Sequence, residues 1–159
     1  MSTLNLKIKL LTAPYNFELY SGVSLATDAI DGFANTEARS TLVVHFYNKV
    51  LGVLGLEGEP IHSVAPSGHP RLFYRHNGGT FCVTEPINGE AASAANGGTI
   101  GFQCDSPEQV KEFHDVAVAN GGTSCEDPPG LRDGALGPMH LAYVRDPDGN
   151  KLCALHRPK

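Results

Sequence analysis

The sequence predicts an α+β fold in which two βαβββ modules form one curved mixed sheet, with a central cleft inside and the helices outside. The order strand, helix, hairpin strands occupies residues 22–86 and recurs over residues 99–156. Residues 88–98 between them are rich in Ala, Gly, Ser and Asn, which is typical of a linker. Because a repeated unit of this size seldom buries its apolar face alone, we expect both modules to pack into one domain spanning residues 1–159.

Apolar spacing predicts two helices. From Ala38 to Leu54, apolar residues recur every three or four positions, which gives a helix one buried face. The second helix begins at Ser106, whose hydroxyl can cap the first turn, with Pro107 at the first helical position and Gln109 completing a capping box. Its predicted buried side chains are Val110, Phe113, Ala117 and Val118.

Short β-prone segments account for most of the remainder, and turn signals separate them. The predicted strands are Val23–Thr27, Leu72–Tyr74, Thr80–Thr84, Thr99–Cys104, Leu141–Arg145 and Lys151–His156. Asn77-Gly78-Gly79 marks one hairpin, and Asp146-Pro147-Asp148-Gly149 marks another. The second turn lacks the further carboxylates of a calcium loop, so we interpret it as a tight turn alone.

Composition and charge exclude several classes of protein. The 159 residues carry a formal net charge of −5, and Lys and Arg are scattered, so nucleic acid is not an expected partner. No apolar run reaches the ~18 residues of a membrane span. Lys7 and Lys9 interrupt the apolar N-terminal stretch, which argues against a signal peptide. We therefore expect a cytoplasmic protein, whose four cysteines, with no Cys-x-x-Cys pair, are free thiols.

Several stretches carry a family resemblance. They include Phe46-Tyr47-Asn48-Lys49-Val50-Leu51 in the first half, which is the weaker part, Gly98-Thr99-Ile100-Gly101-Phe102, and the ending from Tyr143 to Lys151, which is the most specific. They resemble the vicinal-oxygen-chelate superfamily, which includes glyoxalase I, bleomycin-resistance proteins and extradiol dioxygenases. The resemblance covers about residues 22–156 and is closest to small bacterial glyoxalase-like, or lactoylglutathione-lyase-like, members. It implies a small-molecule pocket and a homodimer.

The resemblance also implies a site for one divalent metal ion, and this sequence departs from it. In metal-dependent members each module gives a His at the start of its first strand and a carboxylate on its last strand. Here Gly22 and Thr99 stand at the His positions, and Cys153 stands at the second carboxylate. The first module offers Val83 or Glu85. We therefore expect no metal and no cofactor, since one thiol and one carboxylate cannot replace four ligands.

The resemblance leaves several functions open, and whether the chain is an enzyme is one of the open points. The first reading is a metal-free protein that binds a small organic ligand in the cleft. Its candidate ligand-binding residues are Phe81, Val83, Thr99, Phe102, Arg132, Tyr143 and Cys153. Arg132 is expected in a loop that covers the cleft, where a guanidinium can clamp a carboxylate or phosphate.

The second reading is an enzyme, either a lyase or isomerase of the lactoylglutathione-lyase type or a dioxygenase relative, with or without a metal. General acid–base chemistry would then depend on Glu85, the weak catalytic candidate, or on a His. A Cys153–His140 nucleophile pair is a further alternative. The third reading is a partner-binding subunit that uses the N-terminal extension, residues 1–20. The role of that extension and of the long connection from Asp28 to Thr41 stays open.

Overall fold

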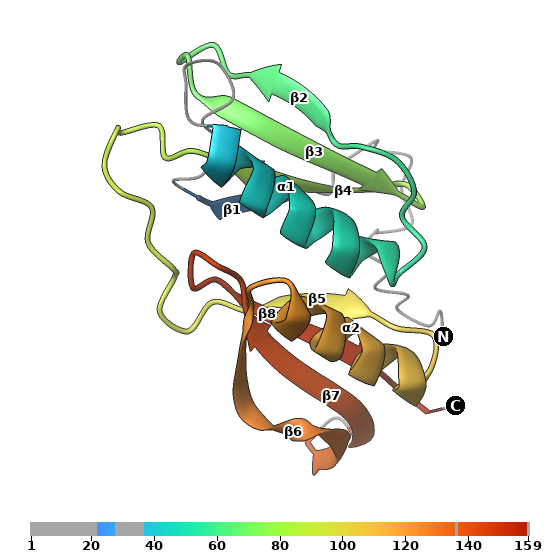
Figure 1. The fold of residues 1–159 in the computed structure, drawn as a ribbon. Helices are drawn as coiled ribbons and strands as arrows, with labels where there is room; N and C mark the ends of the chain where they lie inside the picture. The colour runs from blue at the N-terminus through green and yellow to red at the C-terminus, as the bar shows by residue number, and fades with distance from the viewer. Residues whose placement is uncertain (1–21, 28–36, 136, 159) are drawn as a thin grey trace, which may run out of the picture.

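The computed structural model describes residues 22–27, 37–135 and 137–158, and shows two modules of the same construction (Figure 1). The first module comprises β1 (Gly22–Ala26), α1 (Glu37–Gly52), β2 (Ile61–Val64), β3 (Pro70–His76) and β4 (Gly79–Thr84). The second comprises β5 (Ile100–Gln103), α2 (Pro107–Ala119), β6 (Thr123–Gly134), β7 (Gly137–Arg145) and β8 (Lys151–His156). The predicted α+β fold of two βαβββ modules is therefore confirmed.

The strands form two four-stranded sheets of equivalent topology. Their orders are β1-β4-β3-β2 and β5-β8-β7-β6. In each sheet the first pair is parallel and the other two pairs are antiparallel. Within the described part of the chain no strand pairing joins the two sheets, so the single curved sheet of the prediction is instead two open sheets.

Two edge strands, β2 and β6, lie outside the predicted set. Strand β2 has only four residues, and β6 contains Pro128 and Pro129 together with a register shift between Cys125 and Gly130. Proline cannot donate to a ladder, so it is confined to edges and bulges of a sheet. The segment predicted as a loop over the cleft, which includes Arg132, is thus part of an edge strand.

Helix α2 begins as the sequence predicts. Ser106 is its N-cap, with an extended backbone, and its hydroxyl accepts a hydrogen bond from the backbone N–H of Gln109 at 3.2 Å. The Gln109 side chain in turn accepts from the N–H of Asp105 at 2.6 Å. The prediction of the buried face is correct for Val110, Phe113 and Ala117. Val118 is 42% exposed, because it lies at the margin of the helix face that packs against the core.

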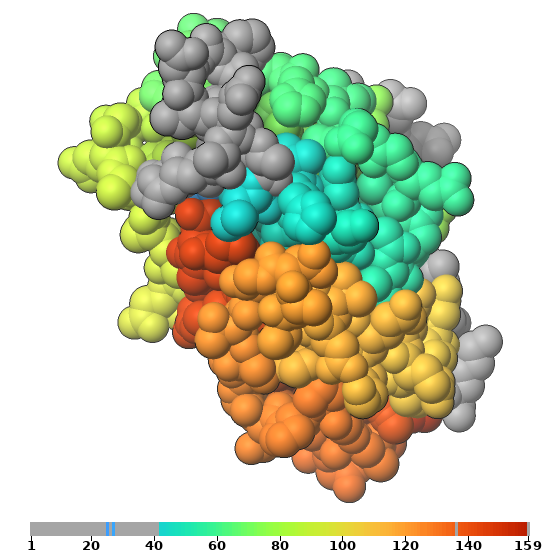
Figure 2. Space-filling view, in the orientation of Figure 1, coloured from blue at the N-terminus to red at the C-terminus, as the bar shows by residue number. Residues whose placement is uncertain are grey.

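The two modules share one core. Helices α1 and α2 lie side by side on the same side of the molecule, and the space-filling view shows their surfaces in contact (Figures 1 and 2). A chain of fully buried aromatic rings crosses from one module to the other. Its ring centroids are separated by 5.0, 5.6 and 5.5 Å along Tyr47, Phe81, Phe102 and Phe113. Ring pairs at these spacings stabilise a core beyond the area they bury.

Polar contacts from the turn before β8 reinforce this junction. Tyr47 on α1 donates from its hydroxyl to the carboxylate of Asp146 at 2.6 Å, and Thr27 donates to Asp148 at 2.5 Å. The N–H of Gly149 donates to the carbonyl of Asp146 at 2.9 Å, which closes the predicted turn. The turn of the second module therefore also binds the first module through hydrogen bonds. Burial raises the pKa of Asp146, although bonds from Tyr47 and Asn150 oppose the rise.

The N-terminal extension, residues 1–20, lies outside the described residues, and so does most of the long connection from Asp28 to Thr41. Among the helices that the structure describes, none is both long and apolar enough to cross a membrane.

Candidate functional site

Each sheet has one face against the helices and one face turned away from them. On β4, Phe81 and Val83 point to the helix side and have no exposed surface. On β8, Leu152 and Ala154 do the same. Because successive strand residues alternate between faces, the residues between them lie on the opposite face. We call that opposite face of the second sheet the distal face.

Three of the predicted ligand-binding residues belong to the helix side. Phe81, Val83 and Phe102 are 0% exposed and lie in the core cluster beneath α1 and α2. They therefore give no surface to a pocket on the distal face. Alternation divides the residues of a strand between two faces, but it does not say which face packs against the helices. The sequence alone therefore could not show that Phe81, Val83 and Phe102 lie on the helix side.

A pair of thiols occupies equivalent places in the two modules. Cys82 follows the hairpin glycine Gly78 by four residues, and Cys153 follows Gly149 by four. Each cysteine is 5% exposed and lies beside an aromatic residue of the neighbouring strand. The register pairs Cys82 with Phe73 and Cys153 with Tyr143.

This register corrects the position taken for the first module. The residue equivalent to Cys153 is Cys82, and neither Val83 nor Glu85 is. Glu85 follows the end of β4, where its backbone N–H donates to Pro70 at 3.3 Å, and alternation carries it to the side of Phe81. Counting from the two hairpin glycines would have found Cys82 in the sequence.

The other residues at the implied metal positions are found at strand beginnings. Gly22 is the first residue of β1. Thr99 is exposed and immediately precedes β5. Neither side chain has an imidazole or a carboxylate to offer.

The alternative Cys153–His140 pair is not assembled. His140 is three residues from Tyr143 on β7, so it lies on the opposite face of the sheet from Cys153. Its register partner is His156, and the two rings lie at right angles with centroids 6.3 Å apart.

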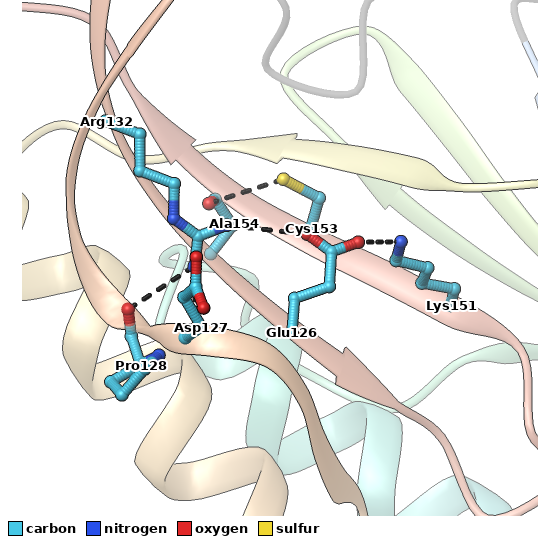
Figure 3. A network of polar contacts seen from close by, with 7 residues as sticks. All are labelled: Glu126, Asp127, Pro128, Arg132, Lys151, Cys153 and Ala154. Atoms are coloured by element: carbon cyan, nitrogen blue, oxygen red, sulfur yellow. Dashed lines mark hydrogen bonds and ion pairs between the residues drawn. The ribbon is translucent and has the colours of Figure 1, made fainter.

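On the distal face, charged groups gather around Tyr143. The guanidinium carbon of Arg132 lies 5.2 Å from the ring centroid, and Nζ of Lys151 lies 4.7 Å from it. Both cations pair with the carboxylate of Glu126 (Figure 3). We call these four residues with Cys153 the Tyr143 cluster. Three members of the cluster, Arg132, Tyr143 and Cys153, are among the residues proposed from the sequence, whereas Glu126 and Lys151 are not. Lys151 lies two residues before Cys153 on β8, and Glu126 reaches Arg132 through the bulge of β6, which the sequence does not reveal.

Burial keeps the two nucleophilic side chains of this cluster protonated. It raises the pKa of the Cys153 thiol to about 11, although a hydrogen bond with Tyr143 opposes the rise. Burial also raises the pKa of Tyr143 to about 12, helped by the neighbouring thiol. Since a thiolate is the form that attacks electrophiles and binds metals, Cys153 is a neutral, poorly nucleophilic group at pH 7.

The residues at the implied metal positions do not fit a divalent ion of the kind the resemblance suggests. They are glycine, threonine and two thiols in place of two imidazoles and two carboxylates. Among the residues that the structure describes, no three His, Cys, Asp or Glu side chains gather in a group that could hold a metal.

Two hollows elsewhere on the chain do not include the Tyr143 cluster. The larger, about 250 Å³, lies between the start of α2 and β6, and is lined by Pro107, Glu108, Val110, Lys111, Pro129, Gly130 and His140. A smaller one lies near the end of α1 and the start of α2.

Two βαβββ modules of this construction define a class of small paired-module α+β domains. The chain belongs to the glyoxalase/bleomycin resistance protein/dioxygenase superfamily, whose family model matches residues 42–154. It is 46% identical to a glyoxalase/bleomycin resistance protein from Albidiferax ferrireducens T118 of known crystal structure. That match covers 86% of this chain and 97% of the other, with a TM-score of 0.71.

More distant structures share the fold. A glyoxalase-related enzyme from Fulvimarina pelagi is 19% identical, with 86% of each chain covered and a TM-score of 0.57. A lactoylglutathione lyase from Agrobacterium tumefaciens is 16% identical, with 85% of this chain and 90% of the other covered and a TM-score of 0.53. Likeness at this level of identity shows the fold alone. The search of curated proteins gave no match.

Proposed function

We propose that this chain binds a small organic ligand on the distal face of its second sheet, without the divalent metal ion of metal-dependent relatives. One observation carries the proposal. Two cations and a carboxylate gather around the aromatic ring of Tyr143, beside the position where the resemblance implies a metal ligand, and the residue at that position is a neutral thiol. Binding sites commonly combine an apolar surface with a few placed polar groups in this way.

The free edges of the sheets support a homodimer as part of the proposal. Neither of the two hollows described above includes Tyr143, and among the described strands both sheets have free edges. A second copy would supply the opposite wall, and edge strands such as β6 are natural places for such contacts. We also retain the cytoplasmic location as part of the proposal.

A ligand-observed NMR screen of small organic acids and their neutral analogues tests the binding function, carried out before and after treatment of the protein with a chelator. We expect binding that survives chelation and is lost in Tyr143→Ala. Leu42→Ala is the matched control, because Leu42 is an apolar side chain exposed on α1 and far from the distal face.

Metal analysis of the purified protein tests the competing enzyme reading. One bound Ni, Zn, Fe or Mn per chain, together with lyase activity on a hemithioacetal that chelation removes, would overturn the proposal. The same assay with Glu85→Gln tests the weak catalytic candidate. On our account that variant differs from wild type in no binding or catalytic property, since Glu85 follows the helix side of β4.

A further inference from the structure

The Tyr143 cluster holds a carboxylate between two cations, and its charges do not balance. Arg132 and Lys151 contribute two positive charges and Glu126 contributes one negative charge, so the cluster retains one net positive charge. Both cations also lie against the ring of Tyr143, whose face attracts positive charge. The site is therefore electrostatically suited to an anion beside an aromatic surface.

Glu126 is the outermost of the three charged side chains. Its side chain is 41% exposed, whereas those of Arg132 and Lys151 are 22% and 23% exposed. The carboxylate side chain is thus the most accessible of the three to solvent. A carboxylate arriving from solvent would therefore meet the Glu126 side chain before it meets the two cations.

The backbone at Glu126 is held in an unfavourable conformation. Its φ is +62°, which side chains other than glycine rarely adopt. The residue lies in the bulged part of β6, where the register shifts between Cys125 and Gly130. Strain of this kind persists where the surroundings over-determine it, and it tends to collect at functional sites.

Arg132 does not depend on Glu126 for its position. Its guanidinium donates to the backbone carbonyls of Asp127 at 2.6 Å and Pro128 at 3.3 Å (Figure 3). Its bond to Glu126 is longer, at 3.4 Å. The guanidinium therefore stays in place when Glu126 leaves, and a preorganised group of this kind loses less freedom on binding.

From these observations we propose that Arg132 and Lys151 recognise a carboxylate of the ligand, and that Glu126 occupies their site in the free protein as an internal carboxylate that the ligand displaces. The inference rests on the proposed function, because it assigns the charge class of the ligand for the same face. The ligand class is a small aromatic or unsaturated carboxylate, since Tyr143 offers the flat surface beside the cations.

Titration calorimetry with benzoate, and with benzamide as its neutral isostere, tests the displacement. Removing the internal competitor in Glu126→Gln is expected to raise benzoate affinity about tenfold and to leave benzamide affinity unchanged. Lys151→Gln and Arg132→Gln are expected to lower benzoate affinity by a similar factor. Glu112→Gln and Lys49→Gln remove one charge each from exposed helix positions and serve as matched controls. Circular dichroism verifies that each variant is folded.

The outcomes separate this inference from the proposed function. Unchanged or weaker benzoate binding in Glu126→Gln, an equal gain for benzamide, or no benzoate binding in either protein would overturn the displacement. If both probes bind equally and Tyr143→Ala loses both, the proposed function stands and the displacement is wrong. If Tyr143→Ala keeps both affinities, the probes bind elsewhere and both proposals fail.

Discussion

The faces of the two sheets that point away from the helices share a plan and differ in chemistry. Each carries a buried thiol that donates to the carbonyl of the next residue, at 3.7 Å for Cys82 and 3.6 Å for Cys153. Each thiol lies beside an aromatic ring with a cation over it, since Arg71 lies 5.6 Å from the ring of Phe73. Among the described residues, only the second sheet adds a carboxylate and a second cation, Glu126 and Arg132, and both come from its twelve-residue edge strand; the edge strand β2 of the first sheet has four residues. The repeated framework thus fixes the positions of the thiol and the aromatic ring in both sheets, and the longer edge strand β6 adds Glu126 and Arg132 in the second.

The largest expected effect compares the two faces of the second sheet. Phe102→Ala removes a ring that contacts Phe81 of the first module and Phe113 of α2, and is expected to lower the free energy of unfolding by about 3 to 5 kcal/mol. Tyr143→Ala on the distal face is expected to cost about 1 kcal/mol, since its ring is partly exposed. Urea denaturation measures both. If Tyr143→Ala cost more than Phe102→Ala, the distal face, and not the helix side, would be the buried core face of the second sheet.

The next effect concerns the junction between the modules. Tyr47→Phe removes the hydroxyl that donates to buried Asp146, and is expected to cost about 1 to 3 kcal/mol of unfolding free energy because a buried acceptor loses its partner. Tyr74→Phe is the matched control. Its hydroxyl is also buried but has no hydrogen-bond partner among the residues that the structure describes, so its removal is expected to be neutral or stabilising. Equal losses in the two variants would show that the bond to Asp146 does not hold the modules together.

Much of the framework could be predicted from the sequence because local chemistry specifies it. The cap at Ser106 and the turn at Asp146-Pro147-Asp148-Gly149 rest on residues whose backbone preferences are strong. The edge strands could not be predicted in this way. Strand β6 is largely exposed and contains two prolines, so its pairing with β7 is decided by the partner strand.

The site was less accessible to sequence reasoning than the framework. Phe81 and Phe102 look like pocket residues because a cleft and a core both favour aromatic side chains, and alternation alone cannot distinguish the two. Glu126 attracts no attention in the sequence, since its role depends on a bulge that brings it to Arg132 and Lys151.

A pH measurement sharpens the comparison at the module junction. Because burial raises the pKa of Asp146 in the folded protein, folding is coupled to proton uptake at this carboxyl. Its contribution to stability is fully present below the unfolded pKa, about 3.9, and is lost as pH rises through the folded value. We expect the advantage of wild type over Asp146→Asn to be larger in acid than at neutral pH. An advantage that grows as the pH rises would contradict the direction of the shift.

The smallest effect concerns the reactivity of the thiols. Cys125 is half-buried, whereas Cys82 and Cys153 are both 5% exposed, so a chromogenic disulfide reagent is expected to label Cys125 first and the equivalent pair slowly. Cys125→Ser should remove the fast phase. Because the pKa of Cys153 is about 11, its labelling should accelerate as the pH approaches that value. Fast labelling of Cys153 at pH 7 would show that it is a thiolate there.

The most direct test of the account is to determine which of the two sheets binds the ligand. An NMR titration of isotopically labelled protein with benzoate would map the amide shifts along the chain. Our account predicts shifts confined to the backbone around Glu126, Arg132, Tyr143 and Cys153. Shifts centred on Phe73 and Cys82 of the first sheet, or on α1 and α2, would contradict it.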